Sequence, residues 1–154
     1  MNSIFDKQSF AHHQYFFSEG TWSGAGTIIA IENSMSLHFT MTKKIIFSEE
    51  GKLQINQQVE VVENKQVWQT DITISNCIDS QFEVNIETPK VGKLVGTGLV
   101  TEKDIGWTAY ETPEKKLGIT LLTYLGNGSY LTNSSYLTQE NLKISISGII
   151  SKTS

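Results

Sequence analysis

The chain has 154 residues, enough for one domain with a buried core, and 38% of them are hydrophobic, as in a globular protein. Its net charge of −4, without an acidic tail or a basic stripe, argues against nucleic-acid binding. All twelve cationic residues are lysine, so a planar arginine clamp for phosphate or carboxylate is excluded. Cys77 is the only cysteine, which excludes an intrachain disulfide and a thiolate zinc cluster.

The N-terminal segment predicts a short helix over residues 9–17, with Ser9 as its N-cap and several aromatic residues along it. It lacks a basic start followed by a continuous apolar stretch, so we expect no signal peptide in this chain. No segment reaches the roughly 18 uninterrupted apolar residues of a membrane span. A cytoplasmic protein without a membrane span is therefore the expectation.

After Gly26 the hydrophobic pattern alternates with a period of two and stays so to the end of the chain. This alternation predicts about ten short strands, over residues 27–32, 35–48, 53–61, 68–74, 82–87, 93–101, 105–110, 117–125, 129–138 and 142–150. Gly96 and Gly98 within one of them indicate bending or a close backbone approach.

The dipeptide Asn127-Gly128 predicts a two-residue type I′ hairpin turn. An unbroken ladder from that turn would place Leu125 opposite Tyr130, Thr123 opposite Thr132 and Ile119 opposite Tyr136.

The absence of helical segments between the strands excludes repeated βαβ units and favours an antiparallel meander that covers its own edges. We therefore predict an all-β fold, a single antiparallel up-and-down β-barrel of about 8–10 strands with a short N-terminal helix. Residues 1–154 form one domain in this interpretation, with a helical plug over 1–17 and the barrel over 20–150.

The motif Gly20-x-Trp22-x-Gly24-x-Gly26, following a short helix and preceding a meander, resembles the start of calycin-superfamily barrels. It is most similar to nitrobindin-like and related lipocalin-like bacterial barrels, and residues 141–147 faintly resemble the closing strand of the S-type phycobiliprotein lyases. The resemblance implies that the helix plugs one end of the barrel and that Trp22 packs against it. Glycines beside Trp22 would let the backbone bend and approach its neighbours closely.

Departures from these families narrow the expected chemistry. The arginine that often covers the lipocalin tryptophan is missing, which leaves Lys143 or Lys152 as substitutes. The arginine-tyrosine group with which fatty-acid-binding proteins hold a carboxylate is excluded for the same reason. No histidine follows His38, so haem binding of the nitrobindin type is not expected, and we predict no cofactor.

The chemistry-bearing residues form no convincing catalytic or metal site. His12 and His13 would point about 100° apart on a helix, so we interpret them as solvent-facing residues rather than metal ligands. His38 is expected on the exterior and Cys77 is expected to be buried or incidental. Glu111 continues the face of Trp107 and would be an acid or a cation ligand if it pointed inward, although a solvated strand end is the simpler interpretation.

The more apolar strand faces would line an interior that either holds one small ligand or fills with side chains, and the resemblance favours a cavity. The expected function is binding of a small hydrophobic or amphipathic molecule. The alternatives are a lyase-like enzyme or chromophore-handling protein with Glu111 or His38 at the pocket, and an interaction module with a filled barrel. The residues expected to contact the ligand are Phe39, Met41, Trp68, Thr70, Phe82, Trp107, Glu111, Leu121, Thr123 and Tyr136.

Overall fold

A computed structural model of the chain describes residues 10–30, 34–89, 92–112, 115–137 and 143–153. Ten strands follow one another along these residues, each overlapping one of the ten alternating segments. They are β1 (Gly20–Ala30), β2 (Met35–Phe47), β3 (Leu53–Val61), β4 (Val67–Ile78), β5 (Gln81–Thr88), β6 (Gly92–Val100), β7 (Asp104–Thr112), β8 (Lys115–Gly126), β9 (Ser129–Leu137) and β10 (Lys143–Lys152).

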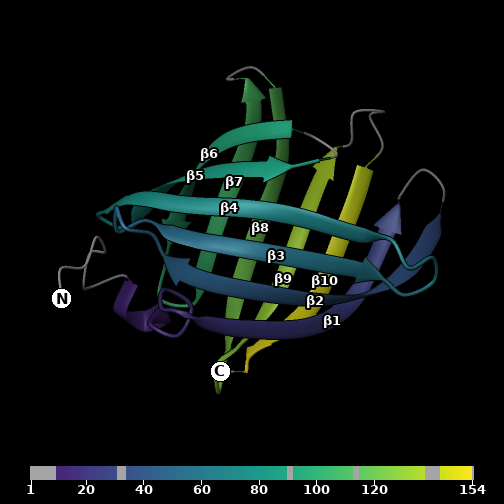
Figure 1. Ribbon diagram of the computed structural model, residues 1–154, viewed down its shortest axis with the longest axis horizontal. Coiled ribbons are helices and arrows are strands. Elements are labelled where there is room, and N and C mark those ends of the chain that lie inside the picture. The colour runs from purple at the N-terminus through teal and green to yellow at the C-terminus, as the bar shows by residue number, and fades with distance from the viewer. Residues whose placement is uncertain (1–9, 31–33, 90–91, 113–114, 138–142, 154) are drawn as a thin grey trace.

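The strands form a closed barrel in which each strand pairs antiparallel with its neighbours in sequence and β1 pairs with β10. In Figure 1, β1 to β4 run across the front of the molecule and β8 to β10 cross behind them at a steep angle. Closure pairs both edges of the meander, so no open sheet edge remains between β1 and β10. The all-β up-and-down barrel predicted from the alternation is confirmed.

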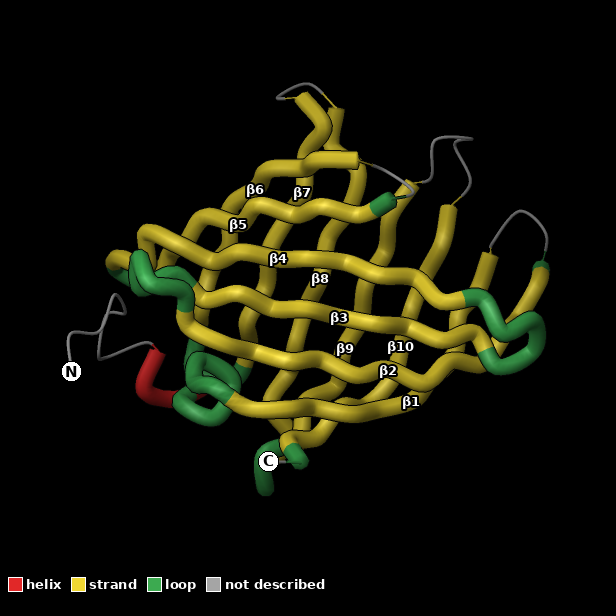
Figure 2. Tube along the Cα trace, viewed as in Figure 1, coloured by secondary structure: helices red, strands yellow, loops and turns green. Residues whose placement is uncertain are grey.

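The N-terminal helix predicted over residues 9–17 is wrong in extent. The described part contains only a 3-10 helix, η1 (Ala11–His13), followed by turns, and residues 1–9, with Ser9, lie outside the described ranges. The backbone N–H groups of Phe16 and Phe17 both donate to the carbonyl oxygen of His13 at 3.0 Å, which closes a tight turn. Figure 2 shows this compact turn, in red and green, at one end of the barrel. Its three phenylalanines, Phe10, Phe16 and Phe17, are buried.

The glycine-rich motif lies inside β1 rather than before it, because the strand begins at Gly20 and not at residue 27. Gly26 lies directly opposite Gly148 of β10. A Cβ atom on Gly26 would overlap the carbonyl oxygen of Ser147, and one on Gly148 would overlap that of Ala25. The glycines therefore permit a close approach of the two strands that close the barrel, as the motif indicated.

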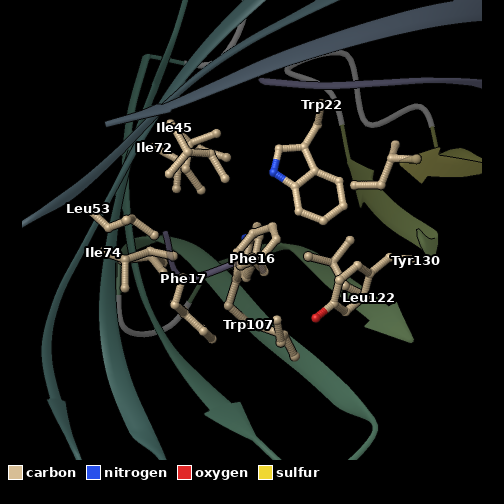
Figure 3. Close-up of a cluster of buried hydrophobic side chains, with 14 of the residues drawn as sticks. Phe16, Phe17, Trp22, Ile45, Leu53, Ile72, Ile74, Trp107, Leu122 and Tyr130 are labelled. Atoms are coloured by element: carbon tan, nitrogen blue, oxygen red, sulfur yellow. The ribbon is translucent and has the colours of Figure 1, made fainter. Parts of the chain in front are cut away.

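The packed half of the core surrounds Trp22, which is fully buried. Figure 3 shows Trp22 beside Phe16, with Tyr130 and Leu122 next to them, and the ring centroids of Trp22 and Phe16 lie 6.0 Å apart. Lys152 lies opposite Trp22 in the β1–β10 register, and its Nζ donates to the Ser18 hydroxyl at 2.8 Å. Lys143, the other candidate for this end, lies opposite Leu137 at the far end of β10.

The β8–β9 hairpin has the expected turn but not the expected register. Asn127 and Gly128 both have positive φ, 54° and 73°, as a type I′ turn requires. The ladder shifts between Tyr124 and Gly126, so Tyr124 and not Leu125 lies opposite Tyr130. Leu125 is an inserted bulge residue, and because side chains alternate, this one-residue shift reverses the inner and outer faces of β8.

Candidate functional site: a cavity in the barrel

A cavity of about 420 Å³ occupies the half of the barrel away from the Trp22 cluster. Strands β2 to β10 all contribute residues to its wall. Aliphatic and aromatic side chains predominate, among them Val59, Ile72, Leu94, Ala109 and Ile146. The barrel is thus filled by aromatic rings at its plugged end and hollow beyond them.

Five of the predicted contact residues line this cavity, and they come from the four strands β2, β4, β7 and β9: Met41, Trp68, Thr70, Trp107 and Tyr136. Trp107 also contacts the packed half, since its ring centroid lies 6.3 Å from that of Phe82. Burial raises the pKa of Tyr136 to about 12, so its phenol stays protonated and offers a hydrogen bond to a guest molecule.

Phe39 and Phe82 are buried as predicted, but they lie in the packed core and not in the cavity wall. The Phe82 ring lies against Gly98 of the neighbouring strand, where a Cβ atom would overlap it. Phe39 lies opposite Gly26, and a Cβ atom on Gly148 would lie 3.0 Å from the Phe39 ring. Gly98 of β6 and Gly148 of β10 therefore make room for core aromatic rings rather than for a ligand.

The placement of Leu121 and Thr123 in the cavity is wrong. Leu121 is 41% exposed on the outer surface, and the Thr123 hydroxyl donates to the Asp104 carboxylate at 2.8 Å. The bulge at Leu125 causes this, because it turns Leu122 into the packed core and Thr120 toward the cavity. Alternation counted from the turn without a bulge had predicted that Leu121 and Thr123 lie on the inner face of β8.

A lyase-like enzyme would need Glu111 or His38 at the pocket, and both side chains lie at the surface. The Glu111 side chain is 48% exposed and pairs with Lys115 at 3.2 Å. His38 is 65% exposed, and its Nδ1 lies 2.6 Å from a carboxylate oxygen of Glu63. Neither lines the cavity, which agrees with the simpler interpretation of each residue.

His13 is buried, contrary to the solvent-facing position expected for it, whereas His12 is exposed. The Nε2–H of His13 donates to the Thr101 carbonyl at 2.7 Å, and the Nδ1 of His13 accepts from the Tyr130 hydroxyl at 2.6 Å. Both ring nitrogens are satisfied in the neutral form, so this residue anchors the N-terminal turn to the barrel.

Lys43 is one of the polar cavity residues that sequence reasoning missed. Only 2% of it is exposed, and burial lowers the pKa of its amine to about 8. The Nζ atom lies 5.7 Å from the centroid of the Phe16 ring, at the boundary between the cavity and the packed half. A signal was present, because Lys43 continues the inward alternation of Phe39, Met41 and Ile45.

Among the described residues, no helix has the length and apolar character needed to cross a membrane. No protein-family model matches the sequence, and no curated protein does. One solved structure, that of Rv2717c from M. tuberculosis, superposes with a TM-score of 0.70 over 96% of this chain and 98% of that one. The two sequences are 12% identical, so the likeness is one of fold: a ten-strand antiparallel β-barrel.

Proposed function

We propose that the protein binds a small apolar or amphipathic molecule inside the barrel. The observation that carries this proposal is the hollow half of the barrel, whose volume of about 420 Å³ lies within the range typical of small-molecule sites. A barrel that served only as a scaffold would gain stability by filling this space with side chains, as its other half does.

The composition of the wall supports the same function. Apolar surface supplies affinity without direction, while the few polar groups, such as Thr70, Thr132 and Tyr136, supply orientation. The resemblance to the calycin superfamily supports it as well, since it implies a barrel interior that holds a small molecule. We infer a calycin-like binding protein on these grounds.

Fluorescence of Nile red, an uncharged and polarity-sensitive dye, tests the proposal. We expect saturable binding to the wild-type protein and a loss of at least about tenfold in affinity when Ala109→Phe fills the cavity. Ile144→Trp, at the start of β10 and also on the cavity wall, is a second filling variant.

The matched control removes an apolar group from outside the barrel. Leu121→Ser lies on the outer face of β8, so it should leave dye affinity within about twofold of the wild type. Dye binding that survives both filling variants but is lost in Leu121→Ser would place the dye on the surface and refute the proposal.

A further inference from the structure

Three polar side chains form a row across the apolar wall of the cavity. Lys43 of β2 lies opposite Gln57 of β3, and Gln57 lies opposite Thr70 of β4. All three line the cavity. Directly opposed residues on one face of an antiparallel sheet have Cβ atoms about 5 Å apart, so the three form one continuous polar row.

Each member of this row interrupts an inward face that is otherwise apolar. Along each strand the nearest residues on the same face are apolar. They are Met41 and Ile45 in β2, Ile55 and Val59 in β3, and Trp68 and Ile72 in β4. A barrel that only needed a packed interior would have apolar residues at these positions too. The coincidence of the three interruptions at one level of the barrel indicates a shared ligand group.

The charge in this row has no counterion within the part of the chain that the structure describes. No carboxylate within the described ranges forms an ion pair with Lys43. The ring of Phe16 on one side offers a weak cation–π contact in place of an anion. A buried cation without a partner is costly, and an anion brought by a ligand would remove that cost.

We propose that this row binds the acidic group of an amphipathic organic acid, an inference that rests on the proposed function of the cavity. The ammonium of Lys43 would pair with the carboxylate, while the amide of Gln57 and the hydroxyl of Thr70 would donate hydrogen bonds to its oxygens. The apolar part of the acid would lie along the aliphatic and aromatic wall, against Trp107 and Ala109.

Isothermal titration calorimetry with a matched pair of ligands tests the inference. Decanoic acid and decanol share a chain and differ in the group offered to the row. We expect the wild-type protein to bind the acid about tenfold more tightly than the alcohol, the effect of one charge-assisted contact. Lys43→Met, which keeps the side chain as far as its fourth heavy atom and removes the ammonium, should bring the affinities for acid and alcohol to within about twofold of each other.

Lys44→Met is the matched control, because Lys44 is the next residue of the same strand and is exposed on the outer face. It should keep the full preference for the acid. Thr70→Val, nearly identical in shape, is a second variant that removes a donor without removing the charge, and it should weaken acid binding about threefold. If Lys43→Met does not fold, the acid affinity of Thr70→Val still tests whether the row contacts the carboxylate.

Equal binding of acid and alcohol by the wild type, or a preference that survives Lys43→Met, would overturn the inference and leave the cavity function intact. Binding of neither ligand by a protein that still binds Nile red would also overturn only the acid class. Failure to bind Nile red as well would overturn both proposals.

Discussion

The His13 imidazole and the Tyr130 hydroxyl are joined by a 2.6 Å hydrogen bond, although 117 residues separate them in sequence. The bond ties the N-terminal turn to β9, and the bond from His13 to the Thr101 carbonyl ties the same ring to the segment before β7. The neutral imidazole suits both partners, one as an acceptor and one as a donor. Protonation of Nδ1 would destroy the acceptor that the Tyr130 hydroxyl needs.

The His13 contacts predict a loss of stability in mild acid. Burial lowers the pKa of His13 below its ordinary value of 6.5, so the unfolded chain takes up a proton before the folded one does. The stabilisation is fully present above pH 6.5 and is lost as the pH falls toward the folded-state pKa. Urea unfolding between about pH 5.5 and 7.5 measures it.

His13→Gln should be less stable at pH 7 and should lose this part of the pH dependence. His12→Gln, its exposed neighbour, should retain the wild-type slope. An unchanged slope in His13→Gln would mean that another group is responsible.

The closure of the barrel at Gly26 predicts that a single methyl group there is harmful. In Gly26→Ala the new Cβ atom meets the carbonyl oxygen of Ser147, which is backbone and has little room to move. We expect a loss of about 1–3 kcal/mol in the free energy of unfolding, the usual cost of overpacking. Ser23→Ala, an exposed change in the same strand, should cost less than about 0.5 kcal/mol, and equal effects of the two variants would contradict this account.

The ammonium of Lys43, which forms no ion pair with any described residue, predicts that stability rises with pH in the alkaline range. Its folded-state pKa of about 8 lies below the ordinary value of 10.5, so stability is lowest below pH 8 and increases as the pH rises toward 10.5. Tyr136 lines the same cavity, but its raised pKa keeps it neutral over most of that interval.

Unfolding free energies between about pH 7.5 and 9.5 should therefore increase in the wild type and in Lys44→Met. Lys43→Met should lack the increase and should be more stable at pH 7 by about 1–3 kcal/mol, since an apolar side chain replaces an uncompensated charge. A less stable Lys43→Met would show that the ammonium already has a compensating partner.

The burial of Cys77 predicts that its thiol reacts slowly with thiol-specific reagents in the folded protein. Burial raises its pKa to about 12, and the side chain is 3% exposed, so neither the thiolate nor access to it is available in the folded state. A thiol-specific reagent such as dithionitrobenzoate should react at least about 100-fold faster in denaturant than in buffer. A Cys77→Ala/Ile78→Cys double variant places a thiol at the adjacent, exposed position and should react rapidly without denaturant. Fast reaction of native Cys77 would mean that β4 opens locally.

Much of the site could be predicted once each strand's inward face was known. Simple alternation predicted that Met41, Trp68 and Trp107 lie on the apolar face of their strands. All three line the cavity. Lys43 and Gln57 lie on the same faces, and following the alternation through polar residues would have identified them. Their alignment with Thr70 in one row depends on the register between strands, which alternation within a strand does not contain.

Ten strands, their meandering order and the type I′ turn follow from the amino-acid sequence by itself, because side-chain alternation and turn chemistry act between residues close in the chain. Tertiary structure alone decided three features. The bulge at Leu125 reversed β8 and moved Leu121 outside, because register is set by pairing across strands. His13 became buried because its partners lie 88 and 117 residues away. The cavity itself depends on how ten inward faces fill one shared volume, and no single strand carries that information.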